Sequence, residues 1–220
     1  MEAPILVPDS LDEITLEQYQ TFEKLNTKEN QGTIFLMQKM MEIFCGVKFE
    51  LTLNIAHKDV VRIAEHLYKL LNKKQKLKEV FILGRTEFGF IPKLDDITLG
   101  EYIDLDNYLG DWSNMHSALS VLYRPITKRK DERYLIEKYD GTKYSEVMKQ
   151  APLSVAIGSM VFFYNLRSEL LKHTLTYLKK ELGTNLTLEQ MKILEQSGDG
   201  IKASLDSLSE ILQDLNISQA

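Results

Sequence analysis

The stretch that decides the fold runs from Asp95 to Pro125. It begins Asp-Asp-Ile-Thr-Leu-Gly-Glu-Tyr-Ile-Asp-Leu-Asp-Asn-Tyr-Leu-Gly-Asp-Trp, up to Trp112, and closes Leu-Tyr-Arg-Pro at residues 122–125. Thr98 and Glu101 have the spacing of a capping box, in which each side chain bonds the backbone amide of the other residue. The stretch therefore predicts a capped helix, a Gly-Asp break and a second helix that holds the only tryptophan.

The apolar residues of this stretch recur at helical spacing. The first helix has an apolar set made of Leu99, Tyr102, Ile103, Tyr108 and Leu109, and the second has Trp112, Met115, Leu119, Leu122 and Tyr123. A stripe of this kind normally faces the core. We therefore expect both sets to be buried and the carboxylates between them to cap helices or face solvent.

The totals describe an ordinary globular chain. It has 220 residues, 44% of them hydrophobic and 27% charged, with a formal net charge of −5. This balance argues against binding nucleic acid or anionic membranes over the whole surface. The single cysteine, Cys45, rules out an intramolecular disulfide, and its place at an apolar helix end predicts a small buried hydrophobe.

The same helix-start pattern occurs twice more, at Thr15 with Gln18 and at Thr187 with Gln190. Apolar spacing and boundary residues predict further helices over residues 31–45, 57–74 and 152–182. Residues 150–166 carry no charge, and this length is at the lower limit for crossing a bilayer. Their proline, serines, glycine and asparagine favour a buried central helix, so we predict no membrane segment.

One β-hairpin is expected at about residues 80–91. Two β-rich runs flank Gly84-Arg85, which fits a two-residue turn. A lone hairpin is not stable, so it needs a partner. The candidates are residues 134–136 and residues 47–55, whose alternation indicates a strand, although a loop with one helical turn fits the second run as well.

These patterns predict a mainly α (α+β) fold. It consists of a multi-helix domain with one small β-hairpin and a C-terminal helical extension. The expected boundaries are residues 1–183 for the globular domain and 184–220 for the helical appendage.

Two groups of residues are candidates for contact with a partner. A polar stretch over 125–142 reads as a surface loop, and a basic set in and beside it could meet phosphate or an acidic protein, or simply be solvated: Arg124, Lys128, Arg129, Lys130 and Arg133. The last helix has a heptad stripe that could pack within the chain, on a partner or on a second copy: Ile201, Leu205, Leu208, Leu212 and Leu215.

No pattern for catalysis is present. The four histidines lack the spacing of a zinc site, and the phosphate-binding, dinucleotide-binding and nucleophile-elbow motifs are absent. We therefore predict no catalytic residues, no cofactor and no metal site, and a protein that is not an enzyme. Nucleic acid could be contacted only through the basic loop.

Four strings resemble a family of uncharacterised proteins from tailed phages of Bacteroidetes hosts, including the crAss-like group. They are residues 88–108, 118–126 and 139–142, and the Phe-Phe-Tyr-Asn-Leu end of the apolar helix at 162–166. The resemblance covers about residues 9–170 and carries no known catalytic motif.

The resemblance implies a structural protein of the virion, found in the host cytoplasm during assembly. The first expectation is an internal cargo protein held in capsid or tail and ejected with the genome. The alternative is a tail-assembly chaperone or a head–tail connector component. The partners would be portal, tail or capsid proteins, or copies of the chain itself.

Overall fold

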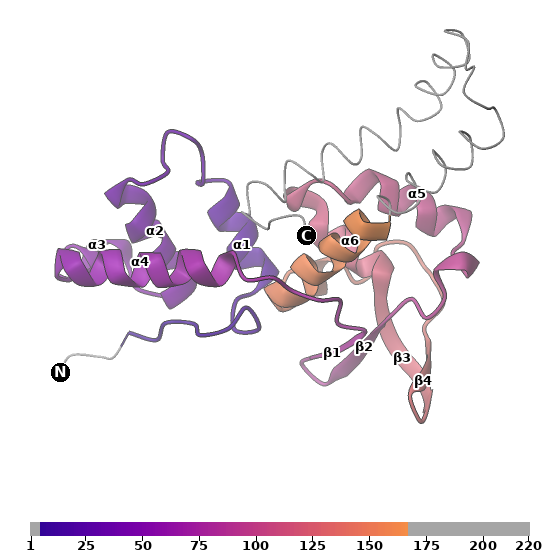
Figure 1. The fold of residues 1–220 in the computed structure, drawn as a ribbon. Helices are drawn as coiled ribbons and strands as arrows, with labels where there is room; N and C mark the ends of the chain where they lie inside the picture. The colour runs from indigo at the N-terminus through magenta and orange to yellow at the C-terminus, as the bar shows by residue number, and fades with distance from the viewer. Residues whose placement is uncertain (1–4, 167–220) are drawn as a thin grey trace, which may run out of the picture.

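The computed structural model describes residues 5–166, which form helices packed around one antiparallel sheet (Figure 1). Four helices precede the sheet: α1 (Leu16–Glu23), α2 (Ile34–Cys45), α3 (Phe49–Thr52) and α4 (His57–Leu71). The capping box at Thr15 is confirmed, because its hydroxyl accepts from Gln18 N and the Gln18 side chain accepts from Thr15 N. For residues 47–55 the helical alternative is the correct one, since the run contains α3 and no strand.

The sheet shows that the predicted fold class was wrong. Instead of one small hairpin it has four antiparallel strands in the order β1-β2-β3-β4. They are β1 (Val80–Leu83), β2 (Thr86–Phe90), β3 (Tyr123–Lys130) and β4 (Arg133–Ile136). The first hairpin and its turn are confirmed, with Gly84 at φ 62°. The fold is therefore α+β with a substantial sheet, and neither candidate partner run pairs with β2, because β3 does.

The failure to predict β3 has a physical explanation, whereas β4 contains the candidate run 134–136 but pairs with β3. β3 begins buried at Tyr123 and Arg124 but ends at Lys128–Lys130, where every residue is exposed. A hairpin that extends into solvent has no buried face, so its sequence lacks the alternation that identifies a strand. The tight turn between β3 and β4 has Asp131 at φ 55°, a backbone conformation in which glycine is usually found.

The stretch at 95–125 folds into two helices as predicted, with different bounds. A 3₁₀ turn, η1 (Leu94–Asp96), leads into α5 (Leu99–Tyr108). A second 3₁₀ turn, η2 (Trp112–Asn114), leads into α6 (Met115–Leu122), which passes directly into β3. The expected second helix is therefore shorter, since Tyr123 already belongs to the sheet.

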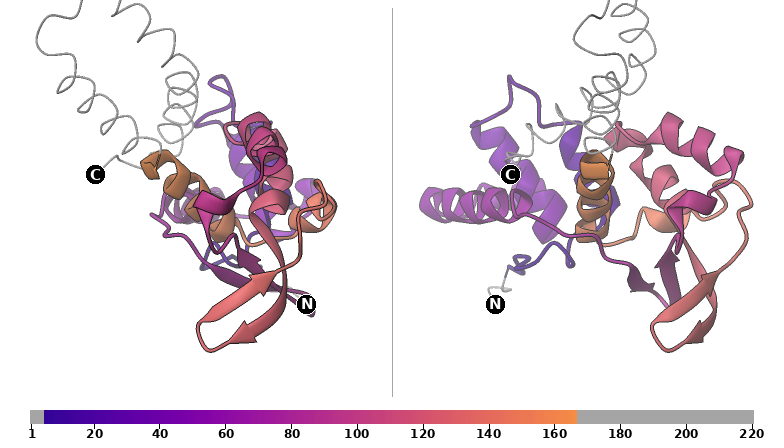
Figure 2. Two further views of the ribbon diagram at one scale, coloured as in Figure 1. Left: turned by 90° about the vertical axis from the view of Figure 1, so that its right-hand side faces the viewer. Right: turned by 45° about the vertical axis from the view of Figure 1, so that its right-hand side comes forward.

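The core is built around the helix at residues 153–166, which follows the short α7 (Ser145–Met148). From residue 153 to 160 every side chain of this helix is buried. Figure 2 shows it standing between the N-terminal helices and the sheet. The prediction of a buried central helix is confirmed over these residues, and its continuation to residue 182 lies outside the described ones.

The two ends of the described region are bonded to each other. Leu16 N donates to Ala151 O at 2.9 Å, and Leu153 N donates to Ile14 O at 2.8 Å. The sheet and the helices other than the short α3 contribute to one cluster of apolar side chains. The proposed appendage at 184–220, the capping box at Thr187 and the leucine heptad lie outside the described residues.

Candidate functional site

Helix α5 turns three of its apolar side chains outward. Leu99, Tyr102 and Ile103 are 74%, 56% and 48% exposed, whereas Glu101 is only 4% exposed. The expectation that the whole apolar set is core was therefore wrong for these three side chains. It holds for Leu109, which is buried, while Tyr108 is half-buried. Leu105, which was not in the predicted set, is buried as well.

Glu101 explains why the helix is oriented this way. Its Oε2 accepts from the backbone N–H and the hydroxyl of Thr98, both at 2.7 Å, which completes the predicted capping box. Its Oε1 lies 2.6 Å from Nη2 of Arg124 on β3. One carboxylate therefore caps the helix and also ties it to the sheet, and this holds the opposite face, with its apolar side chains, toward solvent.

The ion pair between Glu101 and Arg124 is buried, with side chains 5% and 8% exposed. Burial acts to raise the pKa of Glu101, but hydrogen bonds from Thr98 and the charge of Arg124 hold that pKa below its ordinary value. The carboxylate is therefore charged at neutral pH. A buried pair of this kind is weak evidence of stability, yet removing one partner is expensive, so it fixes geometry.

Tyr139 adds a second attachment for α5. Its ring lies under the Arg124 guanidinium, 5.6 Å from Cζ to the ring centroid. Its hydroxyl donates to the carboxylate of Asp104 on α5. Burial and this carboxylate both raise the pKa of the tyrosine, so the hydroxyl keeps its proton. The helix is thus held from the strand on one side and from the segment after β4 on another.

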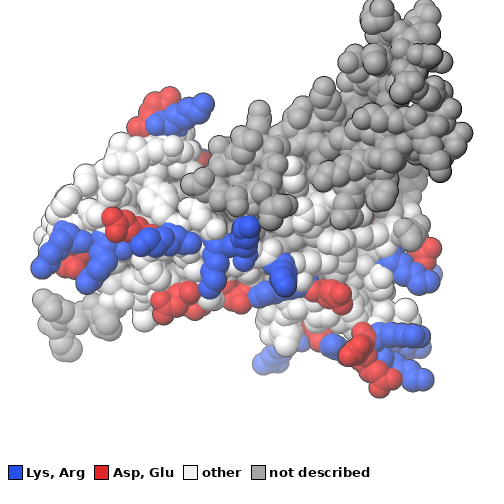
Figure 3. Space-filling view, viewed as in Figure 1, with Lys and Arg blue, Asp and Glu red and all other residues white. Residues whose placement is uncertain are grey.

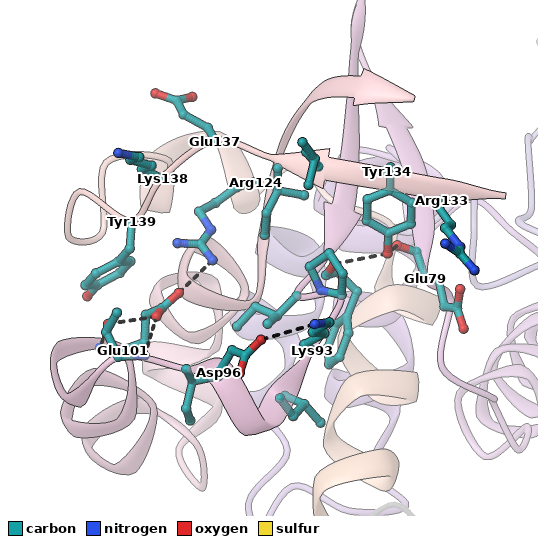
Figure 4. Close-up of a pocket in the computed structure, with 18 of the residues that line it drawn as sticks. Glu79, Lys93, Asp96, Glu101, Arg124, Arg133, Tyr134, Glu137, Lys138 and Tyr139 are labelled. Carbon is teal, nitrogen blue, oxygen red and sulfur yellow. Dashed lines mark hydrogen bonds and ion pairs between the residues drawn. The ribbon is translucent and has the colours of Figure 1, made fainter. Parts of the chain in front are cut away.

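A half-open groove of about 1220 Å³ begins beside this anchor (Figure 4). One wall is residues 132–139, which include β4, and the other is residues 90–98. Polar groups along it are paired, with Lys93 Nζ 3.5 Å from the Asp96 carboxylate and Tyr134 donating to the Phe90 carbonyl. The space exceeds the roughly 300–1,000 Å³ usual for small-molecule sites. Because the groove runs along the edge strand β4, an extended peptide suits it better than a small molecule does.

One donor in this region has no partner. Nε of Arg124 is buried and makes no hydrogen bond to any residue of the described part. The guanidinium therefore contacts Glu101 through Nη2 and the ring of Tyr139 through its face, while Nε takes no part. Its role in the structure is to position α5.

The predicted basic loop is a β-hairpin, and its residues do not act together. Arg124 is buried in the ion pair, while Lys128, Lys130 and Arg133 are exposed. Arg129 pairs with Glu87 on β2. Figure 3 shows acidic side chains among the basic ones at the end of this hairpin. The surface is therefore of mixed charge, and contact with phosphate or nucleic acid stays a prediction.

The rest of the described region offers few other candidates. Within residues 5–166 no cluster of histidine, cysteine and carboxylate side chains could hold a metal ion. Over the same residues no helix combines the length and apolar character needed to cross a bilayer. Cys45 is partly buried, and burial raises its pKa to about 11, in line with its expected role as a small hydrophobe.

Sequence reasoning found the capping role of Glu101 but missed its partner. Arg124 lies 23 positions further on, in a run that read as the start of a loop. One signal was present: from Lys93 to Arg124 the sequence has six acidic residues and no lysine or arginine between them. A buried carboxylate in such a run needs a cation from elsewhere, and Arg124 is the first one available.

Comparison with protein-family models, with curated proteins and with solved structures gave no significant match.

Proposed function

We propose that this chain is a non-enzymatic assembly protein of a tailed phage that binds another protein through the outward face of α5. The observation that carries the proposal is the arrangement of this helix, which buries Glu101 and exposes Leu99, Tyr102 and Ile103. The phage context comes from the resemblance of the four sequence strings.

Exposed apolar side chains need an explanation when they are grouped. Single ones are normal on protein surfaces, but contiguous patches mark sites of interaction. Leu99, Tyr102 and Ile103 lie at i, i+3 and i+4, so they are neighbours on the helix surface. The buried ion pair and Tyr139 hold the helix in place, so the face is ready before a partner arrives. Preorganisation of this kind lowers the entropic loss on binding.

The geometry favours the chaperone or connector alternative over packaged cargo. Cargo that passes through a narrow channel has to unfold in steps. Here Ile14 and Leu16 bond to residues 151–153, and one core takes in side chains from Leu11 to Phe163. Such long-range contacts oppose stepwise opening. The groove along β4 would in addition accept an extended client segment, as a tail-assembly chaperone requires.

The test is co-purification with the structural proteins of the same phage. Portal, tail and capsid proteins are each expressed with the wild-type chain and with the variant Leu99→Ser/Tyr102→Ser/Ile103→Ser. A second variant, Leu51→Ser/Leu53→Ser, is the matched control, because these leucines are also exposed but lie in α3 and at its C-terminal end.

We expect one phage protein to co-purify with the wild type and the control and to be lost with the α5 variant. Mass spectrometry of mature particles should find the chain absent or in trace amounts. Two results together would contradict the proposal: the chain is a regular component of mature particles, and the α5 variant binds every partner normally. They would favour the packaged-cargo function instead.

A further inference from the structure

A row of basic side chains follows α4 and the segment after it. Residues 57–78 contain seven lysines and arginines against two carboxylates, so their net charge is +5 in a chain whose total is −5. Arg62 pairs with Asp59, and Lys78 pairs with Asp12. The other five basic residues are exposed and have no ion pair with any described residue: Lys58, Lys69, Lys73, Lys74 and Lys76. We call these five the α4 row; Figure 3 shows the basic side chains along this helix, with acidic ones along the lower border.

The packing of α4 explains why the row faces solvent. The buried side of the helix is apolar and consists of Val60, Ala64, Leu67, Leu70 and Leu71. Lys58 and Lys69 are eleven positions apart, or about three helical turns, so they lie on the same outer side. Glu65 is an exposed carboxylate between them, and Arg62 lies on that side too. No large apolar side chain within residues 57–78 is exposed, so the surface offered here is almost purely one of charge.

We propose that the α4 row binds the phosphate backbone of double-stranded DNA without reading its sequence. A lysine ammonium group binds phosphate as a point charge. α4 has 15 residues, so it is about 22 Å long, and over that length a duplex carries roughly 13 phosphates, one per 1.7 Å of its axis. The phosphates therefore outnumber the lysines, and the number of lysines sets the strength of binding.

This site is a second surface of the molecule. It differs from the basic loop that the sequence suggested for contact with nucleic acid. It is also separate from the exposed face of α5, because α4 and α5 lie at opposite ends of the described region in Figures 1 and 2. Binding of DNA and binding of a protein at α5 are therefore independent properties of the chain.

The character of the row favours a duplex over other polyanions. A membrane is flat, so it would also meet the acidic border, and the row has no exposed apolar side chain to enter lipid. Protein interfaces have an apolar core, which the row lacks. A single strand binds by stacking its bases on exposed rings, and the one aromatic residue of this segment, Tyr68, is half-buried.

The experiment measures binding of the full chain to a fluorescent duplex of about 30 base pairs by anisotropy, from about 50 to about 200 mM salt. The α4 variant is Lys69→Gln/Lys73→Gln/Lys74→Gln. The matched control, Lys128→Gln/Lys130→Gln/Arg133→Gln, removes the same charge from exposed positions of the β3–β4 hairpin. Further probes are one strand of the duplex, vesicles that contain phosphatidylserine, and polyglutamate. Circular dichroism checks that each variant is folded.

We expect the wild type to bind the duplex with a Kd on the order of 10⁻⁶ M at about 50 mM salt, as in non-specific complexes. Five phosphate contacts correspond to a slope of about −4.5 for log K against log salt, which is a loss of roughly 500-fold up to about 200 mM. The α4 variant should bind more weakly at low salt, with a slope of about −1.8, because three contacts are removed. The hairpin control should keep the wild-type slope.

Four results would overturn the inference. The first is no binding to the duplex at low salt, which would make the row a solvated face only. The second is a hairpin control that weakens binding as much as the α4 variant does. The third is equal or tighter binding of the single strand. The fourth is tighter binding of the vesicles or of polyglutamate than of the duplex, which would identify a membrane or an acidic protein as the partner.

Discussion

Replacing Arg124 with methionine tests whether the buried ion pair fixes α5. The substitution keeps an unbranched side chain of similar length but leaves the carboxylate of Glu101 buried without its cation. Removing one partner of such a pair costs about 3–5 kcal/mol. That is a large share of the roughly 5–15 kcal/mol that stabilises a typical folded domain. We therefore expect a well-resolved shift of the urea midpoint.

A double-mutant cycle separates the ion pair from the rest of the loss. Glu101→Gln removes the charge and retains a capping box, since glutamine serves in the same position at Gln18. We expect Glu101→Gln/Arg124→Met to be less destabilised than the sum of the single variants, with a coupling of about 2–3 kcal/mol. Urea unfolding can be followed by the fluorescence of Trp112, the only tryptophan, which is buried beside α6.

The pH dependence provides the check on mechanism. The pKa of Glu101 is lower in the folded chain than its ordinary value of 4.5. Its contribution to stability is therefore complete above that value and is lost as pH falls toward the folded pKa. The coupling should be full at pH 7 and diminish in acid. Additive single variants at pH 7, or a coupling unchanged in acid, would refute the role assigned to the pair.

Three further outcomes are expected. Gly158→Ala should destabilise the chain by about 1–3 kcal/mol in urea unfolding, because its Cβ would meet the carbonyl oxygen of Lys76 at 2.4 Å. Gly100→Ala, with nothing nearer than 3.5 Å, is the matched control and should stabilise α5 by about 0.5–1 kcal/mol; a loss at both sites would contradict the packing argument. Cys45, with its pKa raised to about 11, should react with iodoacetamide at pH 8 far more slowly than a free thiol, and equal rates would show that it is not shielded. Thr15→Ala should lower thermal stability by the equivalent of about 1 kcal/mol, and no change would mean that the cap is unimportant.

The sequence predicted correctly the helix caps and the turn that depend on residues close together in the chain. Thr15 and Thr98 cap their helices through residues three positions away, and Gly84 forms the turn between β1 and β2. These features depend on neighbours along the chain, so spacing alone reveals them. The buried helix at 153–166 was also predictable, because its apolar residues cover all sides.

Features that depend on distant partners were not predictable. Leu99 and Ile103 belong to an apolar pattern that normally predicts burial in the core. In the structure Glu101 is buried instead, because it pairs with Arg124 on β3. The strand that carries Arg124 was read as a loop since its outer half is charged. The two errors are connected. Because β3 was not predicted, no cation could be identified that would pair with a buried Glu101.

The bonds between residues 14–16 and 151–153 have a consequence for how the chain is made. At roughly 5–20 residues per second, a ribosome needs on the order of ten seconds to go from the first of these segments to the second. Throughout that interval Ile14 and Leu16, which end fully buried, have no permanent neighbours from the 151–153 segment. The amino-terminal helices therefore complete their packing only late in synthesis, and the growing chain spends most of its translation time with apolar surface that the finished protein conceals.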